Sequence, residues 1–224
     1  MEENELQTEK KGKVREALKN YFTATRMAYL ALFTAMAYVL YMPFLEFSLF
    51  PAVPFMKVDF SNSFVMIAGF ALGPVAGVVV GVLKEILHAL TFSQTVGVGE
   101  LANILIMLPY VLLPSILYKK YKGMKAVIIL LVSACALQVA WSVPVNYLLT
   151  FPFYWNLYTG AAWADGMSFY LSVWYWVVLF NLIKTVLVTV VVLILYKPLS
   201  TLIKRTNQKF QARKNKTVEK NIDK

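Results

Sequence analysis

Long apolar runs bounded by basic clusters are the feature that most constrains the fold of this chain. Six segments are candidate membrane spans: residues 27–47, 61–72, 74–92, 98–118, 124–150 and 172–196. About 20 apolar residues are needed to cross a hydrocarbon core roughly 30 Å thick. The second segment is shorter, because its residues rise only about 18 Å as a helix. It is either a short span or the first part of one long helix broken at Pro74.

The basic residues decide between these alternatives. Of 22 lysines and arginines, six precede residue 27, four lie within residues 119–125, and nine lie from residue 197 onward. Six spans put all three clusters on one side of the membrane, whereas five would place the basic tail opposite the basic head, against the positive-inside rule. We therefore expect an all-α integral membrane protein with six transmembrane helices, both termini cytoplasmic, and a tight cytoplasmic turn at residues 72–74.

The charge distribution also suggests how the chain is divided. We expect a charged cytoplasmic segment (1–25), a six-helix transmembrane domain (26–200) and a basic cytoplasmic tail (201–224). The first residues contain no apolar core, so they do not resemble a cleavable signal peptide. The net charge of +10 comes from residues at the edges of apolar spans, which predicts contact with membrane lipid and not with nucleic acid.

Two long segments then lie on the outer side, residues 42–60 and 151–171. The first contains three prolines, and the second is rich in Phe, Tyr and Trp. Aromatic residues of this kind often form a belt at the membrane interface. A belt and a set of rings that line or cover a ligand pocket are equally compatible with the second segment.

Polar side chains inside the spans point to a binding site. Such groups are costly in a bilayer and usually face a cavity or a partner. In the six-span topology they gather in the outer halves of four spans: Lys84, Glu85, His88, Glu100, Asn103, Gln138, Asn146, Asn181 and Lys184. This common depth predicts a small-molecule pocket that opens outward.

Asn181 and Lys184 carry the strongest part of this prediction. They are three residues apart, so they share one helix face. Lys184 lies too deep to extend easily to either interface. We therefore expect Lys184 to bind the ligand.

A structural role is an equal alternative for the charged residues of the third and fourth spans. Lys84, Glu85 and Glu100 could form ion pairs between helices and never touch a ligand. His88 lies near the outer surface, and we expect it to be structural.

Small residues recur at helical spacing on the first three spans. They are Ala24, Ala28, Ala31 and Ala35 on the first, and Gly69, Gly73, Gly77 and Gly81 across the second and third. Small side chains let helix backbones approach closely in lipid. We interpret the glycines as internal packing, and the alanines equally as packing or as a docking face for another membrane subunit.

Motifs for catalysis are missing from the sequence. It has no G-x-x-x-x-G-K-[ST] phosphate loop, H-E-x-x-H or G-x-S-x-G pattern, so nothing recruits a nucleophile or a metal. With one cysteine and one histidine, a Cys/His metal site is not expected. We expect a binding subunit without a cofactor, which takes its energy from partners; a membrane enzyme acting on a lipid or isoprenoid is a remaining alternative.

Four segments resemble the riboflavin-specific S component of energy-coupling factor (ECF) transporters. They are FPAVPFMKVDFS (50–61), GFALGP (69–74), GVGELAN (97–103) and FNLIK (180–184). They occur in the family's order, and the resemblance covers roughly residues 25–200.

The resemblance implies a six-helix protein of the bacterial cytoplasmic membrane that captures a vitamin from outside. It would then dock on a transmembrane coupling subunit and two cytoplasmic ATPases. The family's flavin-contacting residues carry over to Asn146, Asn181 and Lys184, with riboflavin as transported ligand. The family's A-x-x-x-A docking motif matches Ala31 and Ala35.

The resemblance also implies a lid over the site between residues 51 and 59. Its candidate residues are Pro54, Phe55, Met56, Lys57 and Asp59. Because Lys184 could also face a phosphate, flavin mononucleotide is an alternative ligand. An S component for another vitamin and a membrane protein without a small ligand are further alternatives.

Overall fold

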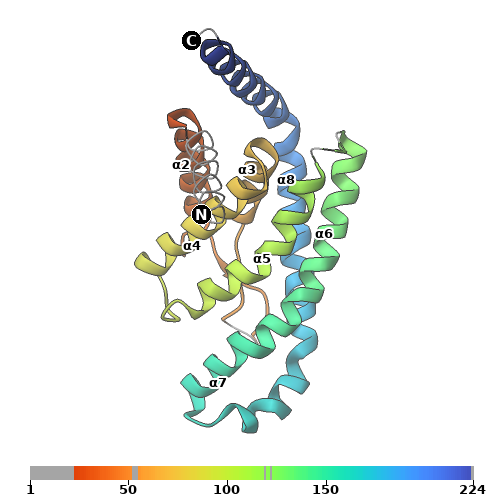
Figure 1. Cartoon of the computed structure of the whole chain (residues 1–224). Helices are drawn as coiled ribbons and strands as arrows, with labels where there is room; N and C mark the ends of the chain where they lie inside the picture. Colours follow the sequence, from red (N-terminus) through yellow and green to blue (C-terminus); the bar gives the residue numbers. More distant parts are fainter. Residues whose placement is uncertain (1–22, 52–54, 119, 122, 223–224) are drawn as a thin grey trace, which may run out of the picture.

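The computed structural model describes residues 23–51, 55–118, 120–121 and 123–222, and it is mostly helical (Figure 1). The helices are α2 (Ala24–Val39), α3 (Asn62–Leu72), α4 (Pro74–Thr91), α5 (Val98–Leu117), α6 (Met124–Val145), the π-helix η1 (Asn146–Thr150), α7 (Phe151–Thr159) and α8 (Trp163–Ile222). Two short strands, β1 (Phe47–Ser48) and β2 (Lys57–Val58), form an antiparallel hairpin between α2 and α3. The hairpin departs from the all-α expectation.

Within the described part of the chain, four helical segments are long and apolar enough to cross a membrane. They are Pro74–Thr91, Val98–Leu117, Met124–Thr159 and Trp163–Tyr196. Helix α3 is apolar but has only 11 residues, and α2 has 16. The chain is therefore a multi-pass membrane protein, while the count of six spans and the cytoplasmic side of the termini stay predictions.

A tight turn separates α3 from α4, as expected. Gly73 has φ 98°, a conformation that a residue without a Cβ adopts at little cost. Pro74 follows as the first residue of α4, where its missing N–H would have no helical partner anyway. The alternative of one long helix broken at Pro74 is therefore wrong.

Two expected boundaries are also wrong. The first helix ends at Val39, not at residue 47, because the chain turns there toward the hairpin. Residues 151–171 are not a loop. The π-helix η1 continues α6 into α7, which ends at Thr159 and is capped by Gly160 with φ 67°, and α8 begins at Trp163. Ring packing stabilises this helical corner, with the Phe151 and Tyr170 centroids 5.0 Å apart.

One end of the bundle brings together several helix ends. The Arg26 side chain donates a hydrogen bond to the Leu72 carbonyl, and the Tyr118 and Tyr196 hydroxyls lie 2.8 Å apart. The Phe70 ring of α3 connects the two contacts, since its centroid lies 4.8 Å from that of Tyr118 and 6.1 Å from that of Tyr196. The start of α2 and the ends of α3 and α5 therefore lie near residue 196 of α8. This arrangement agrees with a topology in which these four points lie on one side of the membrane.

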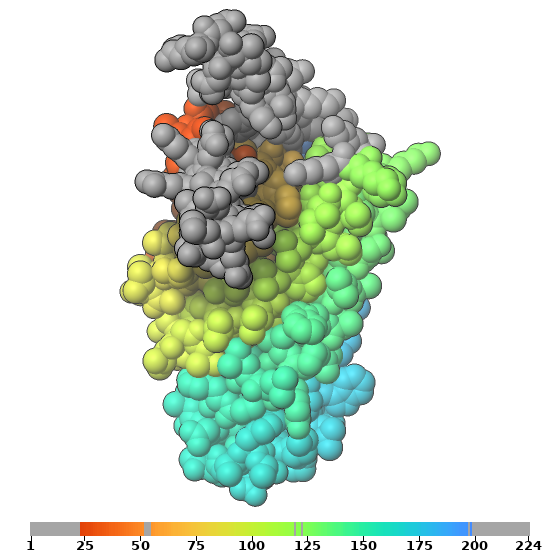
Figure 2. All heavy atoms as spheres, viewed as in Figure 1, coloured from red at the N-terminus to blue at the C-terminus, as the bar shows by residue number. Residues whose placement is uncertain are grey.

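Gly69, Gly77 and Gly81 pack internally, as we interpreted them, whereas Gly73 forms the turn. A Cβ on Gly77 would lie 2.7 Å from Val111 Cγ1 and 3.0 Å from Gly69 Cα. Helices α3, α4 and α5 can approach this closely because no side chain intervenes. Side chains of α4, α5, α6 and α7 cover most of the face seen in Figure 2.

The fold does not test the expected division of the chain into residues 1–25, 26–200 and 201–224. Residues 1–22 lie outside the described part. The backbone of α8 continues through residue 200 to Ile222 without a break.

Candidate ligand-binding site

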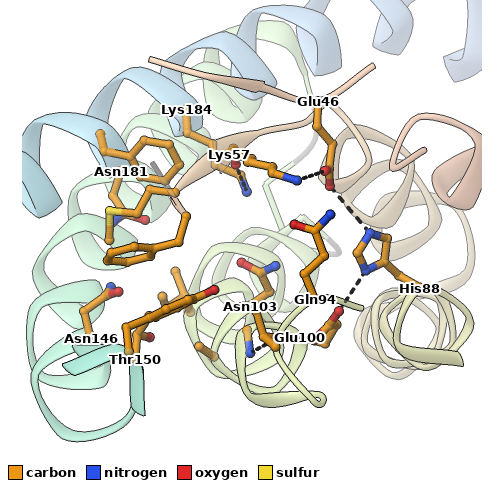
Figure 3. Close-up of a pocket in the computed structure, with 18 of the residues that line it drawn as sticks. Glu46, Lys57, His88, Gln94, Glu100, Asn103, Asn146, Thr150, Asn181 and Lys184 are labelled. Carbon is orange, nitrogen blue, oxygen red and sulfur yellow. Dashed lines mark hydrogen bonds and ion pairs between the residues drawn. The ribbon is translucent and has the colours of Figure 1, made fainter. Parts of the chain in front are cut away.

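A cavity of about 250 Å³ lies among η1, α4, α5, α8 and the hairpin. Two groups of polar side chains face each other across it (Figure 3). One group, the amide–lysine wall, consists of Asn146, Asn181 and Lys184. The other, the carboxylate–histidine wall, consists of Glu46, His88 and Glu100.

The amide–lysine wall holds all three residues expected to bind ligand. Asn146 Nδ2 donates to the Ser142 carbonyl at 2.8 Å, and Asn181 Nδ2 donates to the Val177 carbonyl at 2.9 Å. Each bond ties an amide nitrogen to the backbone one helical turn earlier. Among the described residues no group donates a hydrogen bond to either amide oxygen, so each can accept one from a ligand.

Lys184 is held from the other side by the segment that follows β2. Its Nζ lies 2.8 Å from Asp59 Oδ2 and donates to the Lys57 carbonyl at 3.4 Å. Burial alone would raise the pKa of Asp59, but the ammonium groups of Lys184 and Lys84 hold that pKa well below its usual range. Lys184 therefore contributes an N–H donor whose charge is already balanced.

The expected lid residues fall into three groups. Phe55, Met56 and Lys57 line the cavity. Asp59 is 1% exposed and acts through its ion pair with Lys184. Pro54 lies outside the described residues.

The carboxylate–histidine wall is centred on His88. Its Nδ1 lies 2.9 Å from Glu100 Oε1, and its Nε2 lies 3.6 Å from Glu46 Oε1. The Tyr41 ring stacks on the imidazole with a centroid distance of 3.9 Å. His88 joins two carboxylates and also lines the cavity. The structural role expected for it stays a prediction.

Lys84 and Glu85 pair with each other within α4, and not between helices as the structural alternative had it. Their side chains form a buried ion pair of 2.8 Å, and Lys84 Nζ donates to Ser61 Oγ at 2.6 Å. Neither is among the residues that line the cavity. Glu100 differs, because it pairs with His88 at the cavity wall.

Three residues that line the cavity each carry a buried polar atom without a hydrogen-bond partner in the described part of the chain. The atoms are Asn62 Oδ1, Gln138 Oε1 and Thr150 Oγ1. A buried polar atom left unpaired costs about 1–3 kcal/mol, so a ligand that pairs with these atoms would gain affinity. We did not identify Asn62 or Thr150 from the sequence, although both are polar residues at the edge of apolar runs.

The remaining walls suit a flat ring system. The Phe55 and Tyr154 rings stack with centroids 4.1 Å apart, and Phe180, Ile106 and Met107 also line the cavity. Aromatic and aliphatic surfaces are typical of sites that bury planar ligands. Tyr154 belongs to the aromatic segment 151–171, so part of that segment lines the pocket.

The alanines of α2 lie away from the cavity. Ala24, Ala28, Ala31 and Ala35 are all exposed, and none lines the pocket. They form a smooth outer surface on the helix. Docking by Ala31 and Ala35 stays a prediction.

The chain is similar to a family of membrane transport components and to individual proteins of that kind. The family model described as the substrate-specific component of ECF transporters matches residues 25–196. The riboflavin transporter RibU of Staphylococcus aureus (strain TCH60) is 29% identical over 180 residues, which are 80% of this chain and 93% of that protein. The riboflavin transporter FmnP of Bacillus subtilis (strain 168) is 31% identical over 63% of this chain and 76% of its own length.

A solved structure gives the same result for the fold. It is described as the S component of a bacterial ECF transporter and superimposes with a TM-score of 0.67 at 28% identity. The match covers 80% of this chain and 98% of that one. The chain belongs to the family of substrate-specific (S) components of ECF transporters.

Proposed function

We propose that the chain is the riboflavin-binding S component of an ECF importer. One observation carries the proposal: Asn146, Asn181 and Lys184 converge on one wall of a cavity between the helices. These are the residues that the family resemblance relates to flavin contact. Relatives named as riboflavin transporters in two species support the same ligand.

The chemistry of the amide–lysine wall suits the edge of an isoalloxazine ring. That edge alternates carbonyl and ring-nitrogen acceptors with one N–H donor. Lys184 can donate to the acceptors, and the amide oxygens of Asn146 and Asn181 can accept from the donor. The apolar faces of the ring would lie against Phe55, Phe180 and the neighbouring aliphatic side chains.

Uptake requires partners that supply energy. In this proposal six transmembrane helices place both termini in the bacterial cytoplasm, and the cavity faces outward. The alanine surface of α2, with Ala31 and Ala35, docks on a transmembrane coupling subunit that is joined to two ATPases. The chain itself is not an enzyme, since its partners hydrolyse ATP.

The small molecule that co-purifies with the protein tests this assignment. Protein expressed in riboflavin-containing medium and purified in mild detergent should carry flavin absorbance, and mass spectrometry of the released compound should identify riboflavin. Release of a different vitamin would favour an S component of other specificity. A protein that carries no ligand and acquires none from a vitamin mixture would contradict the proposal.

A further inference from the structure

A buried network of polar and charged side chains extends from Lys184 into the protein. Lys184 lines the cavity, whereas the other members of the network, Asp59, Ser61, Lys84 and Glu85, do not. Each of these four residues is at most 1% exposed. They are therefore placed to act on a ligand through Lys184 and not by direct contact.

The hydrogen bonds of the network run in a fixed direction. Lys84 Nζ donates to Ser61 Oγ at 2.6 Å, and Ser61 Oγ donates in turn to Asp59 Oδ1. A lysine ammonium group has three donors and no acceptor, so the Ser61 hydroxyl must direct its own proton elsewhere. The contact with Lys84 therefore favours the orientation of the hydroxyl that binds Asp59.

Asp59 passes this constraint on to Lys184. Its Oδ2 lies 2.8 Å from Lys184 Nζ, while the Ser61 amide donates to its Oδ1 at 2.9 Å. A lysine carries its charge at the end of a flexible four-carbon chain, so its N–H groups have a fixed direction only where an acceptor holds them. Asp59 is such an acceptor, and Ser61 holds Asp59 in turn.

Glu85 completes the charge balance of the network. Its Oε1 lies 2.8 Å from Lys84 Nζ, so Asp59 and Glu85 together offset the charges of Lys84 and Lys184. A buried charge that loses its partner is strongly destabilising. The Tyr41 ring also lies 4.5 Å from Lys84 Nζ. Glu85 therefore lets Lys84 remain charged inside the helix bundle.

We propose that Lys84 is a positioning residue for riboflavin binding, with Glu85 as its counter-ion. Acting through Ser61 and Asp59, Lys84 holds the Lys184 ammonium group in the direction that a flavin acceptor requires. This inference rests on the proposed function and assigns a role to two buried residues that do not touch the ligand.

Titration of the ligand-free protein with riboflavin, followed by quenching of flavin fluorescence, tests the inference in two backgrounds, the parent and Lys184→Met. Ser61→Ala removes the connecting hydroxyl. Lys84→Met combined with Glu85→Gln removes both outer charges and keeps the network neutral. Ser63→Ala is the matched control, because Ser63 is buried, does not line the cavity, and carries a hydroxyl without a hydrogen-bond partner in the described part of the chain.

In the parent background, Ser61→Ala should weaken riboflavin binding by about tenfold, equivalent to about 1.4 kcal/mol, because Lys184 loses its fixed direction. The double variant should act in the same direction. In the Lys184→Met background, neither change should alter the affinity by more than about twofold, since the group that they position is missing. Ser63→Ala should leave the affinity unchanged in both backgrounds.

Two results would overturn the inference while leaving the proposed function intact. One is an unchanged riboflavin affinity in both Ser61→Ala and the double variant. The other is the same loss of affinity in the parent and Lys184→Met backgrounds, which would identify a purely structural network. Thermal unfolding in detergent checks each variant, and Ser61→Ala decides alone if the double variant does not fold. If the parent binds no riboflavin, the proposed function itself fails, and the inference fails with it.

Discussion

Lys184 of α8 and Asp59 of the segment between β2 and α3 form a buried ion pair with an Nζ–Oδ2 distance of 2.8 Å. Asp59 Oδ1 also accepts a hydrogen bond from the Ser61 amide at 2.9 Å. The pair therefore joins a wall of the cavity to the end of the segment expected to form the lid. In the proposed function, Lys184 would both bind the ligand and hold this segment in place.

Lys184→Met should weaken riboflavin binding by roughly tenfold to a hundredfold. A hydrogen bond from a charged donor contributes about 1.5–3 kcal/mol, and methionine keeps the length of the side chain but cannot donate. Fluorescence titration measures the loss, and thermal unfolding in detergent checks that the variant is folded. Lys125→Met, at an exposed position of α6, should bind normally; equal affinity of both variants would refute the role of Lys184.

Asp59 should make stability depend on acid pH. Its pKa lies below the ordinary value because of Lys184 and Lys84, although burial opposes this. The stabilisation is therefore complete above about pH 4, the ordinary pKa of aspartate, and is lost as the pH falls through the lowered folded-state pKa.

Asp59→Asn should consequently lower the unfolding temperature at pH 7 and flatten its decline between pH 5 and pH 3. Removing one partner of a buried pair costs about 3–5 kcal/mol. Unfolding temperatures measured across this pH range, with Asp165→Asn as control, test the predicted direction of the pH dependence. An acid decline as steep in Asp59→Asn as in the parent would show that this carboxylate is not responsible.

Gly77→Ala should destabilise the helix bundle. The added methyl group meets Val111 Cγ1 at 2.7 Å and the Gly69 backbone, and overpacking typically costs 1–3 kcal/mol. Gly81→Ala is the matched comparison, because its methyl group meets the flexible end of Met107 and should cost less. An unfolding temperature lower for Gly81→Ala than for Gly77→Ala would contradict the packing described for α3, α4 and α5.

Ala31→Trp should abolish uptake without affecting riboflavin affinity. The residue is exposed on α2 and lies away from the cavity, so a large ring there would obstruct only a docking partner. Uptake by cells that also express the coupling subunit and ATPases measures this effect. Ile129→Trp, at a position 65% exposed on α6, is the control and should transport normally; normal uptake by Ala31→Trp would rule out the docking surface.

Two residues of the amide–lysine wall, Asn181 and Lys184, could be predicted because their signal is local, whereas Asn146 was named from its depth in the expected topology and from the family resemblance. Asn181 and Lys184 have a helical spacing of three, and they lie deep in an apolar span where polar groups are costly. Neither property depends on the tertiary path of the chain. The tight turn at Gly73 was predicted from two signals: a local Gly-Pro pair, and the distribution of basic clusters along the whole chain.

In the carboxylate–histidine wall, His88 and Glu100 were among the polar residues expected at the pocket, but Glu46 could not be predicted. Glu46 lies in an irregular segment with no periodicity, and it meets His88 only because the hairpin folds back over α4. The helical corner at residues 151–171 was missed because Pro152 and Gly160 favour a loop on local grounds. Packing among Phe151, Tyr170 and their neighbours overrides that preference.

Titration of the ligand-free protein with riboflavin tests the central claim most directly. The account predicts saturable quenching of flavin fluorescence with one riboflavin per chain, strongly weakened in Lys184→Met and unchanged in Lys125→Met. Quenching that does not saturate, or that is the same in Lys184→Met as in the parent, would contradict a riboflavin site at the amide–lysine wall.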